Sequence, residues 1–447
     1  MPDIDHPSKW RTLWRWGLRI SGLISLLVVL LLLFWFRGAL YHRFVRFPQE
    51  VANLATLRAD RQPVIGDTGW REYRGVLHSH SLLSHDCEVP FEEILRVLKQ
   101  TGRDFICLSD HCTQGRADFS RQWRGLHDGK LFIPGFEMKE GIMPFGVASD
   151  VVLSNQTDGG TLAKQILAGG GVLFYAHPEE PRAWDRPELT GMEIYNTHAD
   201  FKDEGNIVVQ LVPDLVLNHG RYPEQVLRLI FDRPTANLRR WDDLNRTRHI
   251  TGIGGNDCHQ NTGLRVWCTA AGTLRVEDTS PKTLREVKLN WFTRFLAQLC
   301  FGRLEPGRKL FQVQLDPYDR MARHVSTHVL AQRLNEAAIL EALREGRAFV
   351  SFDLLADSTG FLWLAERPGR RAVMGETLTF SPGTRLRARA PQLCRFTVVK
   401  DGQVVEQREG RALEWSAPGP GTYRVEAELR IRGQWTPWVY ANPIWLR

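Results

Sequence analysis

Six short apolar runs in this 447-residue chain each end in a histidine or a carboxylate. Runs of this length, rich in Val, Ile, Leu and Phe, are typical of strands buried on both faces of a sheet. Imidazole and carboxylate side chains that converge on one place form transition-metal sites. The runs cover residues 73–77, 105–108, 131–136, 172–176, 192–195 and 250–253, and the polar residues that end or follow them include His78, His80, Asp110, His111, Glu137, His177, Asn196, His198, Asp257 and His259.

The spacing of these residues indicates how they are arranged. His78 and His80 are alternate residues of one strand, so their side chains share a face and can bind one ion. In β/α barrels, active sites are built just past the C-terminal ends of the parallel strands. Because the same arrangement recurs in order, the sequence predicts a barrel with a metal site on one rim.

Seven motifs carry a family resemblance: His78-Ser79-His80, Ser84-His85-Asp86, Leu108-Ser109-Asp110-His111, Gly135-Phe136-Glu137, Ala176-His177-Pro178, Glu193-Ile194-Tyr195-Asn196 and Gly254-Gly255-Asn256-Asp257-Cys258-His259. With them the chain resembles the PHP (polymerase and histidinol phosphatase) superfamily of metal-dependent hydrolases, and within it the CehA/McbA-like branch. The resemblance covers residues 70–350, approximately. It implies an α/β fold, a distorted seven-stranded β/α (TIM-like) barrel.

The resemblance also implies two to three divalent metal ions, for which zinc, manganese and iron all fit. One ion would take His78, His80, Glu137 and Asp257. A second would share Glu137 and take His177 and His198. A third would take His111, His259 and a residue near position 85, where either His85 or Asp86 can bind.

Three further residues receive roles beside the ligands. Asp110 precedes a ligand histidine and is the predicted catalytic residue, because it can orient a water molecule or a neighbouring group. A loop-capping carboxylate is the alternative role for Asp110. Tyr195 and Asn196, with the segment 137–150, are predicted to shape the substrate pocket.

The predicted activity is hydrolysis by a metal-bound hydroxide, with a phosphoester as the favoured substrate. Clustered divalent ions acidify a bound water and neutralise charge on phosphoryl oxygens. The alternative substrate is a carboxylic or carbamic ester, or an amide, as the resemblance to the CehA-like branch implies. An alternative of another class is a membrane-anchored binding or sensing module with a structural metal site.

The N-terminal region predicts a single-pass membrane anchor. Residues 20–36 are apolar and uncharged, and as a helix they span about 26 Å, near the lower limit for crossing a bilayer. A cleaved signal peptide is the competing interpretation, and the bulky Phe34-Trp35-Phe36 disfavours it. Four basic residues precede the segment and three follow it within ten residues, which weakly favours an extracytoplasmic catalytic domain.

The predicted domains are a short tail at 1–19, the transmembrane anchor at 20–36, a juxtamembrane connector at 37–70, the barrel at 71–356 and an Ig-like antiparallel β-sandwich at 357–447. Alternating runs separated by Pro-Gly and Asp-Gly predict the sandwich. Residues 361–447 hold fourteen Lys/Arg against eight Asp/Glu, so this region carries most of the net charge of +7. No nucleic-acid module is evident, and seven scattered cysteines do not suggest a disulfide framework.

Several helices are expected from apolar spacing and capping residues, at 89–101, 161–168, 223–232, 238–247, 283–299 and 336–344. His324 and His328 lie four residues apart, a spacing that would let them share a helix face. They stand outside the strand-end pattern, so a structural or substrate-facing role is predicted for them.

Overall fold

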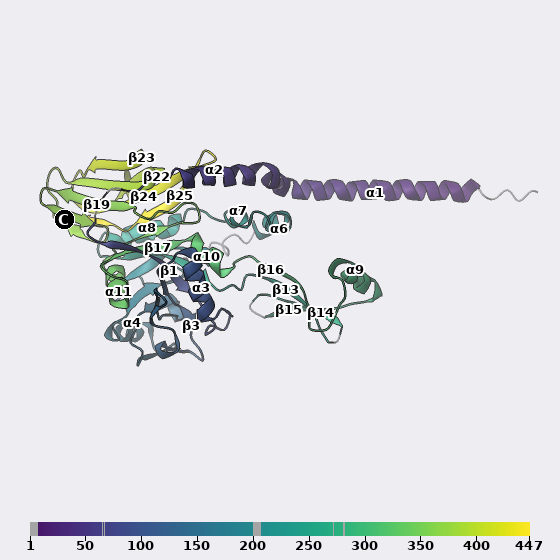
Figure 1. The fold of residues 1–447 in the computed structure, drawn as a ribbon, viewed down its shortest axis with the longest axis horizontal. Helices are drawn as coiled ribbons and strands as arrows, with labels where there is room; N and C mark the ends of the chain where they lie inside the picture. The colour runs from purple at the N-terminus through teal and green to yellow at the C-terminus, as the bar shows by residue number, and fades with distance from the viewer. Residues whose placement is uncertain (1–7, 65, 67, 200–206, 271, 280–281) are drawn as a thin grey trace, which may run out of the picture. The chain divides into compact units, whose positions relative to one another are not determined.

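The computed structural model describes residues 8–447 except 65, 67, 200–206, 271 and 280–281. The chain forms two compact units, one made of Met1–Ala52 with Glu204–Ile230 and the other of Asn53–Asp203 with Phe231–Arg447. The candidate ligands that the sequence singled out all lie in the second, larger unit. The protein is a mixed α/β chain with a long apolar N-terminal helix and antiparallel strands in its C-terminal region (Figure 1).

The smaller unit is helical. Helix α1 (Ser8–Tyr41) runs into a π-helical segment (His42–Arg46) and α2 (Phe47–Ala59), so helix extends well into the predicted connector at 37–70. Helices α6 (Ile207–Leu217) and α7 (Pro223–Leu227) belong to the same unit, and α7 is shorter than the helix expected at 223–232. His42 Nδ1 lies 2.9 Å from a carboxylate oxygen of Asp214, and Arg228 pairs with Glu50.

The apolar part of α1 has no protein cover among the described residues. Its large side chains from Leu13 to Trp35 are mostly about half exposed or more, which is unusual for Leu, Val and Ile in water. The stretch from Leu13 is long and apolar enough to cross a membrane. A segment of this kind near an N-terminus fits either a membrane span or a signal sequence.

In the larger unit, backbone pairing passes from strand to strand and returns to its start. Parallel pairs join β1 to β2, β2 to β6, β10 to β11, β11 to β12 and β12 to β1. Strand β8 is antiparallel to β10, and a bridge between Gly135 and Phe145 connects the residues after β6 to β8. The strands are β1 (Arg71–Ser79), β2 (Phe105–Cys107), β6 (Lys130–Ile133), β8 (Ile142–Phe145), β10 (Val172–Tyr175), β11 (Gly191–Asn196) and β12 (Thr251–Cys258).

Helices and short strands connect these elements. Helix α3 (Phe91–Thr101) joins β1 to β2 and buries Ile94, Val97 and Leu98, and Gly102 ends it with φ 66°. Helices α4 (Gly159–Ala168), α8 (Thr235–Asn245) and α11 (Glu336–Glu345) lie close to three of the expected spans, whereas α10 (Tyr318–His324) was not expected. The short strands are β3 (Asp110–His111), β4 (Arg116–Asp118), β5 (Gly125–His127), β7 (Phe136–Glu137) and β9 (Val152–Ser154).

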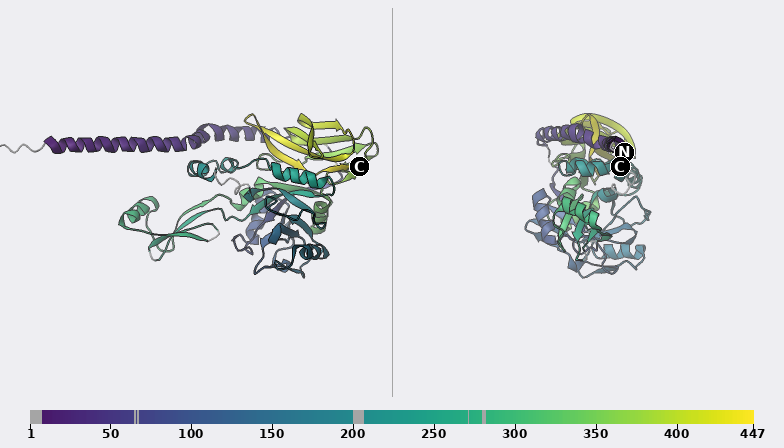
Figure 2. Two further views of the ribbon diagram at one scale, coloured as in Figure 1. Left: turned by 180° about the vertical axis from the view of Figure 1, so that it is seen from behind. Right: turned by 90° about the vertical axis from the view of Figure 1, so that its right-hand side faces the viewer.

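One expectation about the region after residue 260 was wrong. The helix expected at 283–299 is instead strand β15 (Thr283–Lys288) followed by α9 (Trp291–Phe301). Asn290 starts α9 with a capping box to Thr293, and the residues before it pair with β14. The small antiparallel sheet there contains β13 (Gly263–Cys268), β14 (Thr273–Glu277), β15 and β16 (Lys309–Gln314), and α9 follows β15 (Figure 2).

His324 and His328 do not share a helix. His324 is the last residue of α10, whereas His328 lies in β17 (Ser326–Ala331), because the chain becomes extended at Val325. His328 is fully buried, with Nδ1 2.6 Å from Glu72 and Nε2 3.1 Å from Asp353. Arg103 is the second partner of Asp353, at 3.3 Å. His328 is therefore the centre of a buried charged cluster.

The C-terminal strands continue the same hydrogen-bonded sheet. Strand β1 pairs with β17, β17 with β18 (Ala348–Ser351), and β18 with β25. Helix α8 lies beside these strands (Figure 1), and Asp242 of α8 accepts two hydrogen bonds from Arg424. Trp438 and Trp445 are buried core residues. The strands are β19 (Leu362–Arg367), β20 (Arg370–Val373), β21 (Thr377–Leu378), β22 (Arg385–Lys400), β23 (Gln403–Ser416), β24 (Gly421–Ile431), β25 (Gln434–Ala441) and β26 (Ile444–Leu446).

Candidate metal centre

Strand pairing brings the candidate ligands together. His78 is the penultimate residue of β1, and the pairing of Ser79 with Cys258 sets it beside Asp257 in β12. The parallel pair β3–β7 places His111 opposite Glu137. His177 follows β10 by two residues. These side chains therefore lie together at the ends of neighbouring strands, on one edge of the sheet, as the strand-end pattern predicted.

Glu137 contacts four histidines. Its Oε2 lies 3.3 Å from His78 Nε2, 3.7 Å from His80 Nε2 and 3.6 Å from His111 Nδ1. Its Oε1 lies 3.2 Å from His177 Nε2. A carboxylate in this position can serve more than one ion.

Asp257 is the second shared carboxylate. Its Oδ1 lies 3.3 Å from His78 Nε2 and 3.4 Å from His80 Nε2, and its Oδ2 lies 3.4 Å from His177 Nε2. His259 Nδ1 is 3.1 Å from the same Oδ1. Asp257 and Glu137 thus face the same three histidines from two sides.

A neighbouring group gathers His80, Asp86, His111 and His259. Asp86 Oδ2 lies 3.3 Å from His259 Nε2 and 3.6 Å from His111 Nε2. The His85 ring lies tilted against that of His111, with centroids 5.0 Å apart, but among the described residues His85 joins no group of converging ligand atoms. Of the two alternatives near position 85, Asp86 is the one whose carboxylate faces the other ligands.

The assignment of His198 to the second ion stays a prediction. His198 groups with Asp257 and His259, and not with Glu137 and His177 in any group that the described residues form. His198 follows β11, where the backbone already begins a helical turn. Its side chain is directed toward the Asp257 side of the cluster.

The donor set fits divalent transition-metal ions. The ligand atoms are 3.1–3.7 Å apart, close to the separation of about 3.3 Å expected for two ligands of one tetrahedral ion. Buried polar atoms without a partner are unfavourable by about 1–3 kcal/mol each. Within the described part of the chain, such atoms include His80 Nε2, Asp257 Oδ1 and His259 Nε2. A cation bound between them would supply the missing partner.

Three of these residues have a left-handed backbone. The φ angles are 58° for His78, 49° for His177 and 50° for Asp257. Residues with a side chain rarely adopt this conformation, which costs about 1–3 kcal/mol and is concentrated at functional sites. The same three residues form one of the converging groups. The unusual backbone therefore serves to direct these three side chains to one point.

The electrostatics of the cluster favour positive charge at its centre. Burial lowers the pKa of His78, but Asp257, Glu193 and Glu137 outweigh it and hold that pKa well above the usual value. Burial likewise opposes ionisation of Glu137 and Asp257, yet His78 keeps the pKa of both carboxylates well below normal. Burial and His259 lower the pKa of His80, which leaves that imidazole neutral and able to donate a lone pair.

Glu193 is a functional residue to which sequence reasoning gave no role. It is fully buried and lies 2.6 Å from His78 Nδ1. It also accepts hydrogen bonds from the backbone N–H of His177 and from the Asn196 amide, both at 2.9 Å. Glu193 therefore orients two candidate ligands from behind. Because Glu193 lies within an apolar run, the sequence analysis treated it only as part of a strand. The one signal that could have identified it is a charged residue at a position expected to be buried.

We expect Glu193→Gln to lower metal affinity and hydrolysis by about 10–100-fold, the usual effect of an altered partner behind a ligand histidine. A glutamine keeps the size of the side chain but can no longer accept hydrogen bonds at both oxygens. Metal content after dialysis against a buffered metal series would measure the effect. Glu188→Gln, at a partly buried position in the same region, is the matched control; equal affinities in both variants would contradict this role.

Asp110 is a buried positioning residue. Its carboxylate accepts hydrogen bonds from the Ser81 N–H at 2.6 Å, the Ser81 hydroxyl at 2.9 Å and the Gln122 amide at 2.6 Å. Burial raises its pKa, although the bonds from Gln122 and Ser81 oppose the shift. Ser84 links it to the cluster, because its hydroxyl contacts both Asp110 and His80 Nδ1. This geometry matches a group that orients its neighbours; the predicted catalytic role of Asp110 stays a prediction.

Tyr195 and Asn196 line a pocket of about 560 Å³ next to the cluster. Both residues are buried, and the Tyr195 hydroxyl is hydrogen-bonded to His324 Nε2. The Asn196 side chain donates a hydrogen bond to Glu193 and accepts one from the backbone N–H of His198. Glu179 of the same wall lies 3.1 Å from His177 Nδ1. The outer wall is formed by the start of α8 and includes Arg233, Asn237 and Arg240.

No family model matches the chain, and no curated protein matches it. A solved structure from Bacteroides vulgatus ATCC 8482, described as a two-domain protein containing a predicted PHP-like metal-dependent phosphoesterase, is similar over 85% of this chain and 98% of that chain. The two sequences are 13% identical and the TM-score is 0.35. A TM-score this low does not establish a common fold.

Proposed function

We propose that the chain is a metal-dependent hydrolase acting on a phosphoester, and that its closed ring of strands is the distorted seven-stranded barrel of the PHP superfamily. The observation that carries the proposal is the convergence of overlapping His/Asp/Glu groups on Glu137 and Asp257. We further propose 71–356 as the catalytic region and 357–447 as a C-terminal β-sandwich. Bound divalent ions would activate a water molecule and neutralise charge on the phosphoryl oxygens.

Each side chain has a defined part in this proposal. His78, His177, Glu137 and Asp257 would hold one pair of ions. His80, His111, His259 and Asp86 would hold a further ion, with His198 at the Asp257 side. Glu193, Ser84 and Glu179 would fix the imidazole rings, each through the Nδ1 atom of a ligand histidine. Asp110 would keep the loops that carry His80 and His111 in place.

The decisive experiment combines metal analysis with a substrate screen. The full chain, purified in an uncharged detergent, should contain two to three equivalents of zinc, manganese or iron by mass spectrometry. It should hydrolyse phosphate mono- or diesters, and removal of metal by a chelator should abolish turnover. Turnover of carboxylic or carbamic esters or amides alone would select the alternative substrate class. A metal-replete protein inert toward all of them would favour the binding or sensing module.

The pocket beside Tyr195 provides a test of substrate binding. Arg240 is exposed on its outer wall, with its guanidinium over the Trp184 ring at 5.2 Å. For a phosphodiester or an ester bearing a second anion, we expect Arg240→Gln to raise KM about tenfold with kcat unchanged, because a charged hydrogen bond is lost. Arg239→Gln is the matched control, since Arg239 is exposed on the same helix but outside the pocket. An equal KM in both variants would exclude this role.

We also propose that α1 is an uncleaved membrane anchor and that the catalytic region is extracytoplasmic. We expect the full chain to stay in the membrane fraction after alkaline carbonate extraction, because a helix of this length and apolarity inserts stably. Mass spectrometry of the extracted protein should recover the N-terminal peptide. A mature N-terminus after residue 36 would show instead that the segment is a cleaved signal. A reporter fused at residue 60 tests the orientation.

A further inference from the structure

A second cavity, of about 590 Å³, lies on the C-terminal strands, and four of its eight lining residues are arginines. It surrounds the hairpin of β19 and β20, whose turn is Pro368-Gly369, together with Gly383 and Arg385 at the start of β22. Gly369 has φ 71°, which a Pro-Gly turn requires at its second position. We call residues Glu366–Arg371 with Arg385 the arginine hairpin. It contains none of the candidate metal ligands.

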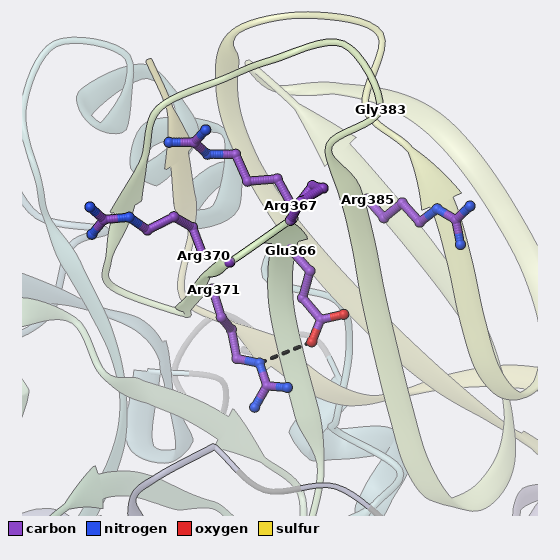
Figure 3. A pocket seen from close by; sticks show the side chains of 8 residues that line it. Glu366, Arg367, Arg370, Arg371, Gly383 and Arg385 are labelled. Carbon is purple, nitrogen blue, oxygen red and sulfur yellow. Dashed lines mark hydrogen bonds and ion pairs between the residues drawn. The ribbon is translucent and has the colours of Figure 1, made fainter.

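Two arginines of this hairpin oppose each other directly. Arg367 and Arg370 are a cross-strand pair in the register of β19 and β20. Like charges placed opposite one another destabilise a hairpin. Figure 3 shows both side chains extending to the same side, whereas Arg371 turns toward Glu366. The arrangement is unfavourable unless a negative group lies between the two guanidinium groups.

The carboxylates nearby are already engaged. Glu366 binds Arg371 Nε at 2.9 Å and Arg387 at 2.7 Å. Glu414 binds Arg387 at 3.1 Å and lies 4.0 Å from Arg385. Among the described residues, the guanidinium groups of Arg367 and Arg370 form no ion pair or hydrogen bond, so these residues leave both charges uncompensated.

Arg367 has a further reason to require a partner. In strand β19 it lies on the same face as Trp363 and Ala365, whose side chains are fully buried. Its Nε atom is therefore buried, and within the described chain this N–H has no hydrogen-bond acceptor. A buried donor without an acceptor is destabilising by about as much as a lost hydrogen bond. An oxyanion in the cavity would satisfy this N–H and both positive charges.

We propose that the arginine hairpin binds a phosphate group. Arginine forms paired, charge-assisted hydrogen bonds with phosphate oxygens, and one doubly charged phosphate can neutralise two guanidinium groups. A single carboxylate would neutralise only one guanidinium group. The cavity is larger than a phosphate ion, so it has room for a phosphate monoester. Both a soluble phosphate ester and the headgroup of an anionic phospholipid carry this chemistry.

The test is calorimetric titration of the full chain in an uncharged detergent. One titration uses inorganic phosphate, and the other uses a water-soluble short-chain phosphatidic acid. Tighter binding of inorganic phosphate would indicate a soluble phosphate ester as the ligand, and tighter binding of phosphatidic acid would indicate a lipid headgroup. Because the candidate metal centre can also bind phosphate, the comparison is between variants. We expect Arg367→Gln/Arg370→Gln to lose one saturable site or to bind at least about tenfold more weakly there. Arg239→Gln, which removes an exposed charge elsewhere, should bind as the wild type does.

Folding is controlled separately. Without phosphate, the thermal midpoint of the double variant should equal or exceed that of the wild type, because a repulsive pair has been removed. Arg370→Gln alone, at the exposed turn, should still weaken binding if the double variant fails to fold. Phosphate should raise the midpoint of the wild type and not that of the variants. Equal phosphate binding by the wild type and the arginine variants, or no such site in the wild type, overturns the proposal.

Discussion

Glu137→Gln should abolish measurable hydrolysis and lower metal occupancy, while the protein still folds. Glu137 lies within 3.2–3.7 Å of four imidazoles, so its replacement affects more than one ion. We expect a loss greater than about 100-fold, the upper range for changing a group behind a ligand. Metal content by mass spectrometry and turnover of a chromogenic phosphate ester measure it.

Glu179→Gln is the graded control for this experiment. Glu179 contacts only one candidate ligand, His177, and its side chain is partly exposed. Its replacement should reduce turnover by about tenfold, the lower range for a group behind a ligand. Full metal content with unchanged turnover in Glu137→Gln would refute the role of Glu137 as a shared ligand, whatever the control shows.

Replacing His328 should have the largest effect on stability. His328→Gln removes one of the two cations of a buried cluster: Glu72 loses its imidazole partner, and Asp353 keeps only Arg103 among the cations described here. Breaking a buried ion pair by removing one partner costs about 3–5 kcal/mol. The midpoint of urea unfolding should fall accordingly. His127→Gln is the control, because its ring bonds the Arg124 carbonyl and not a carboxylate; similar midpoints for both variants would contradict the prediction.

The same cluster predicts how stability depends on pH. Burial lowers the pKa of His328, but Asp353 and Glu72 raise it to about 9, against about 6.5 in the unfolded chain. The stabilisation is therefore complete below about pH 6.5 and is lost as the pH rises through 9. The pKa of Asp353 is lowered in the fold, so its contribution disappears as the pH falls below about 4. His328→Gln should flatten the alkaline decline; a decline as steep as that of the wild type would disprove the link.

The sequence predicted the placement of most candidate ligands because each closes a buried strand. A strand end fixes where a side chain emerges, and parallel neighbours emerge at one edge. His78, His111, Glu137 and Asp257 were found in this way. The pattern could not choose between His85 and Asp86, since both lie in a turn where the backbone path alone decides which side chain faces inward.

Other features depend on contacts that no local pattern records. Glu193 sits inside an apolar strand and is defined by its distant partner His78. The residues 283–288 form a strand because β14 lies beside them, although their spacing also suits a helix. By spacing alone His328 is a helical neighbour of His324, and only the extended backbone at Val325 separates the two. In each case tertiary pairing overrides the local preference of the chain.

The hydrogen bonds of Asn442 have a consequence for how the chain folds. Its side chain accepts a hydrogen bond from the Gly252 N–H at 2.8 Å and donates one to the Gly252 carbonyl at 3.0 Å, on the strand that carries Asp257. These partners are 190 residues apart in sequence. Until residue 442 has been synthesised, the N–H and C=O groups of Gly252 therefore lack these two hydrogen-bond partners. Such long-range closure slows folding and exposes strand edges, so the nascent chain should depend on chaperones until the C-terminal strands dock.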